Sequence, residues 1–178
     1  MSEKIRLATI WLDGCSGCHM SFLDMDQRLV ELAKSVEIVY SPLVDTKEFP
    51  ENVDITLVEG AISTDEDLRK IHTIRERTRL LVAFGDCAVT ANIPSMRNPF
   101  DVNEVMKGIY VERPVLNPQV PNEVVPALRR IATPVHQVVK VDLFVPGCPP
   151  SAATIYYTLS ELIQGRVPDL TRLTRFGA

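Results

Sequence analysis

Four cysteines are the residues of this chain with the widest chemical scope: Cys15, Cys18, Cys87 and Cys148. The first two are two residues apart, and the other two stand singly, each close to a glycine. A framework of disulfides is typical of shorter secreted domains, so it does not suit four cysteines in 178 residues. In a reducing compartment such thiols are metal ligands, catalytic thiols or buried apolar residues.

Each cysteine position follows a predicted strand. Runs of apolar and β-branched residues predict these strands over Ile5–Trp11, Leu80–Phe84 and Val138–Val145. In a parallel sheet the loops after the carboxyl ends of the strands share one edge, where ligands collect. We therefore expect the four thiols to meet at that edge, although three distant stretches of sequence supply them.

The remaining elements alternate between strand and helix. Two further strands are predicted over Val36–Tyr40 and Asp54–Glu59. An apolar stripe predicts a helix between Phe22 and Leu32. A capping box, with Ser63 as N-cap and Glu66 as its partner, predicts the start of a second helix. A third helix is predicted to begin after the N-cap Ser151 and to end at a C-cap at Gly165. This alternation predicts an α/β fold, a flavodoxin-like doubly wound parallel sheet covered on both faces.

Residues 94–134 interrupt the alternation. They hold seven of the 13 prolines, and we expect irregular structure there apart from one short helix near Asp101–Lys107. A long ordered loop of this kind is usually functional or covered by a partner. We predict a single domain over residues 1–178, with a tail at 171–178.

Three kinds of site remain open for the thiols. A [4Fe–4S] cluster takes one thiolate per iron and accepts ligands from separate loops, and the helix N-termini after Cys18 and Cys148 would favour its negative charge. Structural zinc more often uses two close cysteine pairs. A thioredoxin-type dithiol of Cys15 and Cys18 also fits a strand–turn–helix position, but leaves Cys87 and Cys148 without a role.

Charge and hydropathy exclude other classes of protein. With 19 Lys and Arg against 23 Asp and Glu, the net charge is −4, which argues against nucleic-acid binding because phosphate recognition needs a basic face. No apolar run approaches the roughly 18 residues that cross a bilayer. The first residues lack the apolar region of a secretory signal, so we expect a cytoplasmic protein without a membrane span.

Four motifs in this order resemble the small subunit of [NiFe] hydrogenases: Cys15-Ser16-Gly17-Cys18, Glu59-Gly60-Ala61, Gly85-Asp86-Cys87-Ala88 and Gly147-Cys148-Pro149-Pro150. The resemblance spans nearly the whole chain. It implies that Cys15, Cys18, Cys87 and Cys148 hold one proximal [4Fe–4S] cluster. It further implies a large partner subunit that carries the Ni–Fe centre.

The differences from other members point to one type within the family. The chain has no fifth cysteine, so we expect no further cluster in it. This short form resembles the soluble, bidirectional, NAD-linked hydrogenases, in which an Fe–S/flavin diaphorase module takes the electrons. The close alternative is the related subunit of a quinone-reducing respiratory complex, which has two adjacent cysteines where Cys15 and Cys18 are separated.

Glu59 is predicted to lie at the same edge as the thiols. A lone carboxylate is more often solvated, but the family's Glu-Gly motif borders the cluster, so we expect Glu59 and Gly60 beside it. Among the histidines, His72 is predicted at the surface, and surface or capping roles are favoured for His19 and His136. No phosphate-binding glycine motif for NAD is present. The predicted fold has room for FMN, but no residue pattern calls for it.

Overall fold

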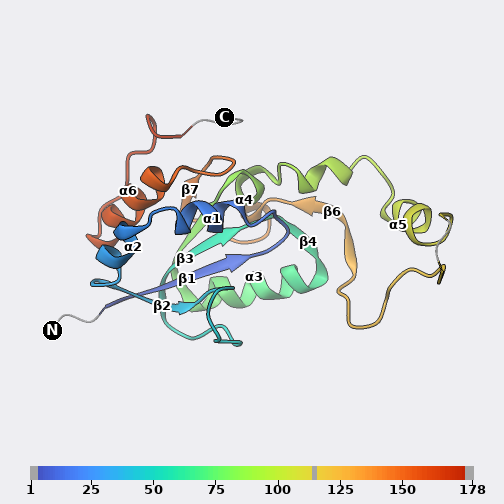
Figure 1. Cartoon of the computed structure of the whole chain (residues 1–178), viewed down its shortest axis with the longest axis horizontal. Coiled ribbons are helices and arrows are strands. Elements are labelled where there is room, and N and C mark those ends of the chain that lie inside the picture. Colours follow the sequence, from blue (N-terminus) through green and yellow to red (C-terminus); the bar gives the residue numbers. More distant parts are fainter. Residues whose placement is uncertain (1–3, 114–115, 175–178) are drawn as a thin grey trace.

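The computed structural model describes residues 4–113 and 116–174. Its centre is a five-stranded parallel sheet with the strand order β2-β1-β3-β5-β7 (Figure 1). The strands are β1 (Ile5–Trp11), β2 (Val36–Tyr40), β3 (Val53–Glu59), β5 (Thr78–Phe84) and β7 (Leu143–Val145). This order is that of the flavodoxin-like doubly wound fold, so the predicted fold class is confirmed.

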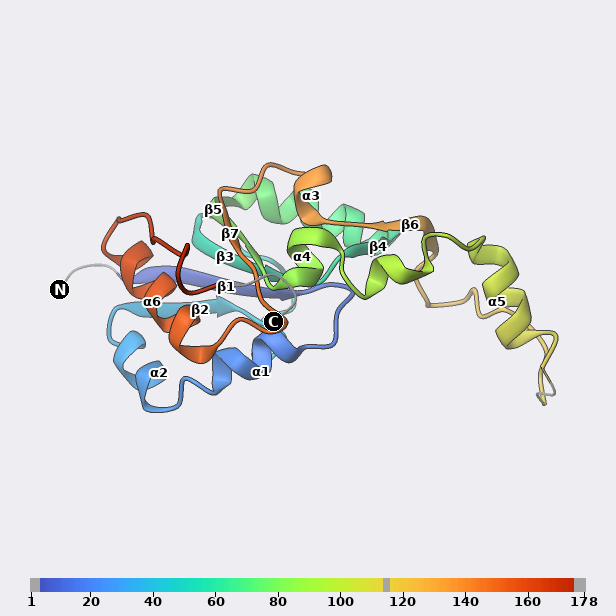
Figure 2. The same cartoon turned by 90° about the horizontal axis from the view of Figure 1, so that it is seen from above.

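Helices cover both faces of the sheet (Figure 2). One face carries α1 (Gly17–Leu23), α2 (Gln27–Leu32) and α6 (Ala152–Ile163), and the other carries α3 (Asp65–Arg77) and α4 (Asp86–Thr90). Along β3, Ile55 and Leu57 pack into the first of these cores, whereas Val58 packs into the second. Both faces of the strand are therefore buried, which explains its unbroken apolar sequence.

The predicted helix between Phe22 and Leu32 is wrong in one respect, because the structure divides it into α1 and α2. The backbone of Asp26 has φ 50°, which interrupts the helical turn. Met25 remains buried, at 3% exposure. The apolar residues between Phe22 and Leu32 therefore do line one buried face, but two short helices supply them instead of one.

A small second sheet was not predicted. Here β4 (Ile62–Thr64) pairs antiparallel with β6 (Leu128–Thr133). Because β4 keeps the backbone extended through Thr64, α3 begins one residue later than expected. Thr64, rather than Ser63, is its N-cap, and Asp67, rather than Glu66, completes the capping box.

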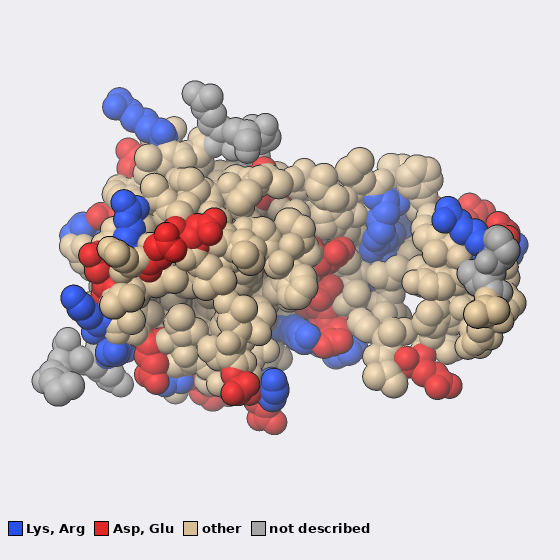
Figure 3. Space-filling model, viewed as in Figure 1, with Lys and Arg blue, Asp and Glu red and all other residues tan. Residues whose placement is uncertain are grey.

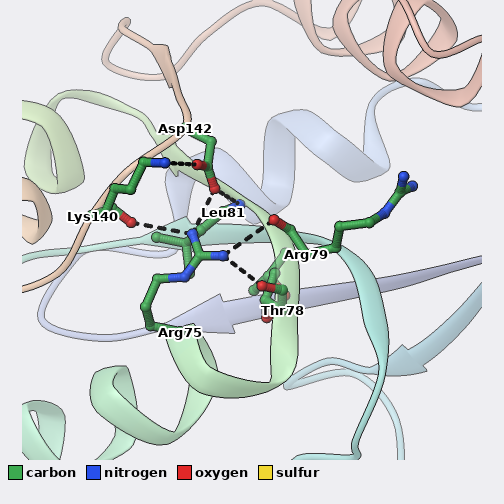
Figure 4. A network of polar contacts seen from close by, with 7 residues as sticks. Arg75, Thr78, Arg79, Leu81, Lys140 and Asp142 are labelled. Atoms are coloured by element: carbon green, nitrogen blue, oxygen red, sulfur yellow. Dashed lines mark hydrogen bonds and ion pairs between the residues drawn. The ribbon is translucent and has the colours of Figure 1, made fainter.

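The predicted final strand over Val138–Val145 is too long, since only Leu143–Val145 pairs with β5. Before it lie a short 3-10 helix, η2 (Val135–Gln137), and a loop that Arg75 holds (Figure 4). Arg75 Nη1 lies 2.6 Å from Asp142 Oδ2, which also accepts the backbone N–H of Leu81 at 2.9 Å. These side-chain bonds, together with the Asp142 N–H that donates to the Leu81 carbonyl at 2.9 Å, fix the loop to β5 and α3.

We call residues 93–127 the arm. It contains the 3-10 helix η1 (Pro94–Arg97) and α5 (Val102–Tyr110), which starts at the N-cap Asp101 and runs past the predicted end. Figure 2 shows α5 projecting to one side of the sheet, beyond β4 and β6. None of the nine described residues of α5 is buried. Beyond the arm, β6 replaces part of the irregular structure expected up to residue 134.

The last helix begins at the predicted N-cap, and its C-cap is Gln164, one residue before the predicted Gly165. The Ser151 side chain caps α6 by accepting the Thr154 N–H at 3.2 Å, and Gly165 follows the helix with φ 72°. The expected tail is joined to this helix at Leu173, whose carbonyl accepts the Thr154 hydroxyl at 3.2 Å, and residues 175–178 fall outside the described range. No helix in residues 4–113 or 116–174 is long and apolar enough to cross a bilayer.

Candidate functional site

All four cysteines lie at the carboxyl edge of the sheet, as predicted. Cys15 lies in the loop after β1, Cys18 in the first turn of α1, Cys87 in α4 directly after β5, and Cys148 in the loop after β7. None of them forms a disulfide in the described structure. Cys18 is buried and Cys87 partly buried, whereas Cys15 and Cys148 are exposed. The set therefore reaches from the protein interior to its surface.

The electrostatics of the two less exposed thiols place all four sulfurs in one neighbourhood. Burial above all, with smaller contributions from nearby Cys148, Cys15 and Glu59, raises the pKa of Cys87 to about 11. Burial also raises the pKa of Cys18, with added repulsion from Glu59 and from the other three cysteines. Both shifts oppose a thiolate without a counter-charge, so the site suits sulfurs that are neutral or bound to a cation.

Gly85 lets the polypeptide backbone lie directly against the Cys18 sulfur. Its φ is 85°, and a Cβ at this position would lie 2.2 Å from Cys18 Sγ. At Gly17, a Cβ would lie 3.2 Å from Cys15 Sγ. Glycine therefore lines the thiol group at two points where any side chain would intrude.

Asp86 ties together the two loops that carry the distant cysteines. Its Oδ1 accepts the Gly147 N–H at 2.7 Å, and its own N–H donates to the Gly147 carbonyl at 2.9 Å. The side chain is only 4% exposed. Cys87 follows Asp86 in sequence, and Cys148 follows Gly147. These two buried hydrogen bonds therefore hold the two cysteines in a fixed relative position.

Glu59 ends β3 and is 1% exposed, so the solvated alternative is wrong. Its Oε2 accepts the backbone N–H of His19 at 3.1 Å and also pairs with His19 Nδ1. Gly60, with φ 95°, follows, and a Cβ there would lie 2.9 Å from the Asp13 backbone. The glycine thus permits the end of β3 to meet the loop after β1, which brings Glu59 beside α1.

His19 is the residue that sequence reasoning missed. Surface or capping roles were favoured for it, yet it is buried at 5% exposure. Its position next to Cys18 was the only sequence signal that it lies near the thiols. The direction of its ring depends on the first turn of α1, which the sequence does not show. The other two histidines are exposed, as expected: His72 lies on α3, and His136 lies edge-on to Phe144 at 5.8 Å between ring centroids.

Two alternatives fit this geometry less well than a cluster does. A dithiol of Cys15 and Cys18 leaves Cys87 and Cys148 without a role, although both lie at the same edge of the sheet. Structural zinc more often uses two close cysteine pairs, whereas this chain has one such pair and two single cysteines. Four free thiols around glycine backbone match the donor set of an iron–sulfur cluster.

The chain matches the family described as "NADH ubiquinone oxidoreductase, 20 Kd subunit" over residues 15–162. This match covers most of the sequence and includes all four cysteines, so the chain belongs to that family. The resemblance proposed from the motifs is therefore confirmed at the level of the family.

Particular relatives narrow the assignment to hydrogenase subunits. The chain is 41% identical to the delta subunit of the NAD-reducing hydrogenase HoxS from Cupriavidus necator, covering 94% of this chain and 82% of that one. It is 38% identical to one subunit of the F420-non-reducing hydrogenase vhu from Methanocaldococcus jannaschii, covering 93% of this chain but 58% of that relative. The chain thus spans little more than half the length of the archaeal protein.

Solved structures agree with this grouping. A chain in the crystal structure of an NAD+-reducing [NiFe]-hydrogenase in the H2-reduced state superimposes with a TM-score of 0.93 at 39% identity, covering 98% of this chain and 99% of that one. The [NiFeSe] hydrogenase of Desulfovibrio vulgaris Hildenborough has a TM-score of 0.60 at 16% identity, covering 92% of this chain and 60% of its own, and shares the fold. The chain is a hydrogenase subunit of the small-subunit fold.

Proposed function

We propose that this chain is the electron-transfer small subunit of an NAD-linked [NiFe] hydrogenase. In this proposal it carries electrons between the Ni–Fe site of a large subunit and a diaphorase module in the cytoplasm. The observation that supports it most is the gathering of four free thiols at one edge of the sheet. The relatives named for NAD reduction support the choice of acceptor.

Cys15, Cys18, Cys87 and Cys148 would each supply one thiolate to a single [4Fe–4S] cluster. When bound, such a cluster accepts and releases one electron at a time. Gly85 and Gly17 keep side chains out of this space, while the buried bonds of Asp86 fix two of the four ligands. The chain itself breaks no substrate bond; its task is to hold the thiolates rigidly and keep solvent away.

Exposed apolar side chains support docking of the large subunit on the arm. Ile93, Met96 and Phe100 are 61%, 67% and 63% exposed. Patches of this kind on a soluble domain mark sites of protein contact. Cys15 and Cys148 are exposed as well, so a partner over this edge would close the site to water. We include the arm, together with the cysteine loops, in the proposed interface.

Glu59 is proposed to set the electrostatic potential at the thiol group. Its carboxylate is buried and acts on both Cys18 and Cys87, so its negative charge would favour the oxidised cluster. His19 orients this carboxylate through two bonds, one from its backbone N–H and one at Nδ1. We make no assignment of FMN to this chain, since no residue pattern or contact calls for it.

Anaerobic purification with the partner chains tests the assignment. We expect a brown assembly with about four irons and four sulfides per copy of this chain, and nickel in the copurifying large subunit. A Cys148→Ser variant should lose the iron, whereas Ser160→Cys, which adds a thiol elsewhere, should leave the iron content unchanged. A colourless protein with one zinc, or one that reduces disulfides without iron, would reject the proposal.

The role of Glu59 has a separate test. Glu59→Gln keeps the shape of the side chain and removes its charge, so the midpoint potential of the cluster should rise while the iron content stays constant. Glu66→Gln, an exposed carboxylate on α3 paired with Lys70, is the matched control. An unchanged potential and an unchanged electron paramagnetic resonance (EPR) spectrum in Glu59→Gln would remove Glu59 from the site.

A further inference from the structure

A cavity of about 560 Å³ lies between the β1–β2 edge of the sheet and helices α1 and α2. Its lining is mainly aliphatic and aromatic, and includes Leu7, Phe22, Leu29, Val36, Ile38 and Leu43. Figure 3 looks onto this side and shows mostly uncharged atoms at the centre of the face. The volume is that of a pocket for a drug-sized ligand.

The cavity exists because α2 does not seal the sheet edge. None of the six described residues of α2 is fully buried, although the helix is apolar on one side. The break at Asp26 turns α2 away from the line of α1, and β2 is the outermost strand on this side. Val30 and Leu43 are left 67% and 60% exposed at the rim.

One polar atom in this lining has nothing to bond. His19 lines the cavity, its Nδ1 is taken by Glu59, and its buried Nε2 has no hydrogen-bond partner among the described residues. The other polar side chains in the lining satisfy each other, since the Thr9 hydroxyl donates to Ser41 Oγ at 2.9 Å. A buried nitrogen without a partner is destabilising, so a bound group that reaches it would be stabilised.

We propose that this cavity binds a small, largely apolar molecule carrying one hydroxyl group, which hydrogen-bonds to His19 Nε2. A hydroxyl can both donate and accept a hydrogen bond, so it suits Nε2 in either role. The apolar body of the molecule would fill the space between α2 and β2. None of the four cysteines lines the cavity, and it shares only His19 with the proposed electron-transfer site, where His19 pairs with Glu59.

The depth of the cavity favours a small molecule over the surface of another protein. Its inner end is formed by side chains that solvent scarcely reaches, with Thr9 at 2% and His19 at 5% exposure. Its outer part is open to solvent, since Val30, Ile38 and Leu43 are exposed there. A flat protein surface would cover Val30 and Leu43 but would leave Nε2 without a partner. A slender ligand would enter at the rim and extend to the inner end of the cavity, where His19 lies.

Binding of 4-ethylphenol and ethylbenzene to the purified hydrogenase assembly tests this inference. The two probes share an apolar body and differ by the hydroxyl. Measured by ligand-observed NMR, 4-ethylphenol should bind about tenfold more tightly, the effect of one hydrogen bond to a buried partner. Ala33→Phe, which adds a ring from the exposed end of α2 into the cavity, should weaken both probes at least tenfold. Lys34→Phe, whose side chain does not line the cavity, should change neither.

Leu43→Trp on the opposite rim provides a second filling variant, in case Ala33→Phe disturbs α2. Equal affinity for the two probes would overturn the role of His19. Undiminished binding in a folded Ala33→Phe or Leu43→Trp assembly would overturn the location. Binding to the isolated full-length chain but not to the assembly would mean that a partner subunit covers the cavity, which would also overturn the inference.

Discussion

The cysteine loops and the arm both lie beyond the carboxyl ends of the sheet strands, and they are built in opposite ways. In the cysteine loops, polar groups are buried and satisfied within the chain, as Asp86 and Gly147 demonstrate. In the arm, apolar side chains face outwards, and α5 buries none of its described residues. The polar groups of the cysteine loops are satisfied by hydrogen bonds within the chain, whereas the arm leaves apolar side chains exposed to solvent.

This contrast separates two requirements of an electron-transfer subunit. Ligands from distant strands must be held rigidly, since the geometry of a metal site depends on the groups behind its ligands. An interface gains its stability only when the partner arrives, so its apolar surface must remain accessible beforehand. Changes in the cysteine loops should therefore damage the chain itself, and changes in the arm should damage assembly.

The largest effect is expected for Gly85→Ala. Its Cβ would lie 2.2 Å from Cys18 Sγ at a φ of 85°, so either the sulfur or the backbone must move. We expect the iron content to fall well below half, with a loss of about 3 kcal/mol or more in unfolding free energy measured by urea titration.

Gly108→Ala in α5 is the matched glycine control. A Cβ there would meet only Glu112 Oε2, at 4.0 Å, and alanine favours helix by about 0.5–1 kcal/mol. Iron content should therefore be unchanged and stability slightly higher. Equal loss of iron in the two variants would contradict the proposed difference between the regions.

A polar change on the arm should affect assembly next most strongly. Phe100→Ser removes an aromatic side chain that is 63% exposed, so the stability of the chain should change by less than about 0.5 kcal/mol. Binding of the large subunit, measured by titration of the isolated subunits, should weaken tenfold to a hundredfold if Phe100 is central to the interface. Unchanged affinity would remove Phe100 from the docking surface.

Asp86→Ala should have a smaller effect, confined to the cysteine loops. It leaves the Gly147 N–H without its partner in a buried position, which costs about 1–3 kcal/mol. The comparison is Asp101→Ala, which removes the N-cap of exposed α5 at about 1 kcal/mol. EPR of the assembly should be altered by the first variant and not by the second.

The smallest effect is expected for a change at Asp142. This residue lies in neither the cysteine loops nor the arm, so it serves as a reference for the comparison between them. Burial alone would raise its pKa, but the Leu81 N–H and Arg75 outweigh this and lower the pKa below the ordinary 3.8. The carboxylate therefore adds stability at neutral pH that is lost as the pH falls through the acid range. In Asp142→Asn, stability should be about 1 kcal/mol lower at pH 7 and should fall less steeply below pH 5. A slope equal to that of the wild type would exclude this role.

The central sheet was predictable because its strands are buried on both faces. Ile5–Trp11 and Val36–Tyr40 were predicted with the boundaries that the structure has, since local apolar runs are sufficient evidence for such strands. The β4–β6 pair was not predicted, because its two strands are far apart in sequence and β4 is only three residues long. Residues 138–142 were wrongly included in the last strand because three of them are valines, but of these five only Asp142 bonds to β5.

Some features of the candidate site were likewise predictable from the sequence, and others were not. The amino-acid sequence by itself determined which atoms are available: four thiols, each placed after a strand, with glycines beside them, because residue type and the position of a strand along the chain are local properties. Only the tertiary structure decided that Glu59 is buried against His19, that Asp86 bridges two cysteine loops, and that α2 leaves a cavity at the sheet edge. Those features depend on distances between segments that the fold alone brings together, and no spacing along the chain encodes them.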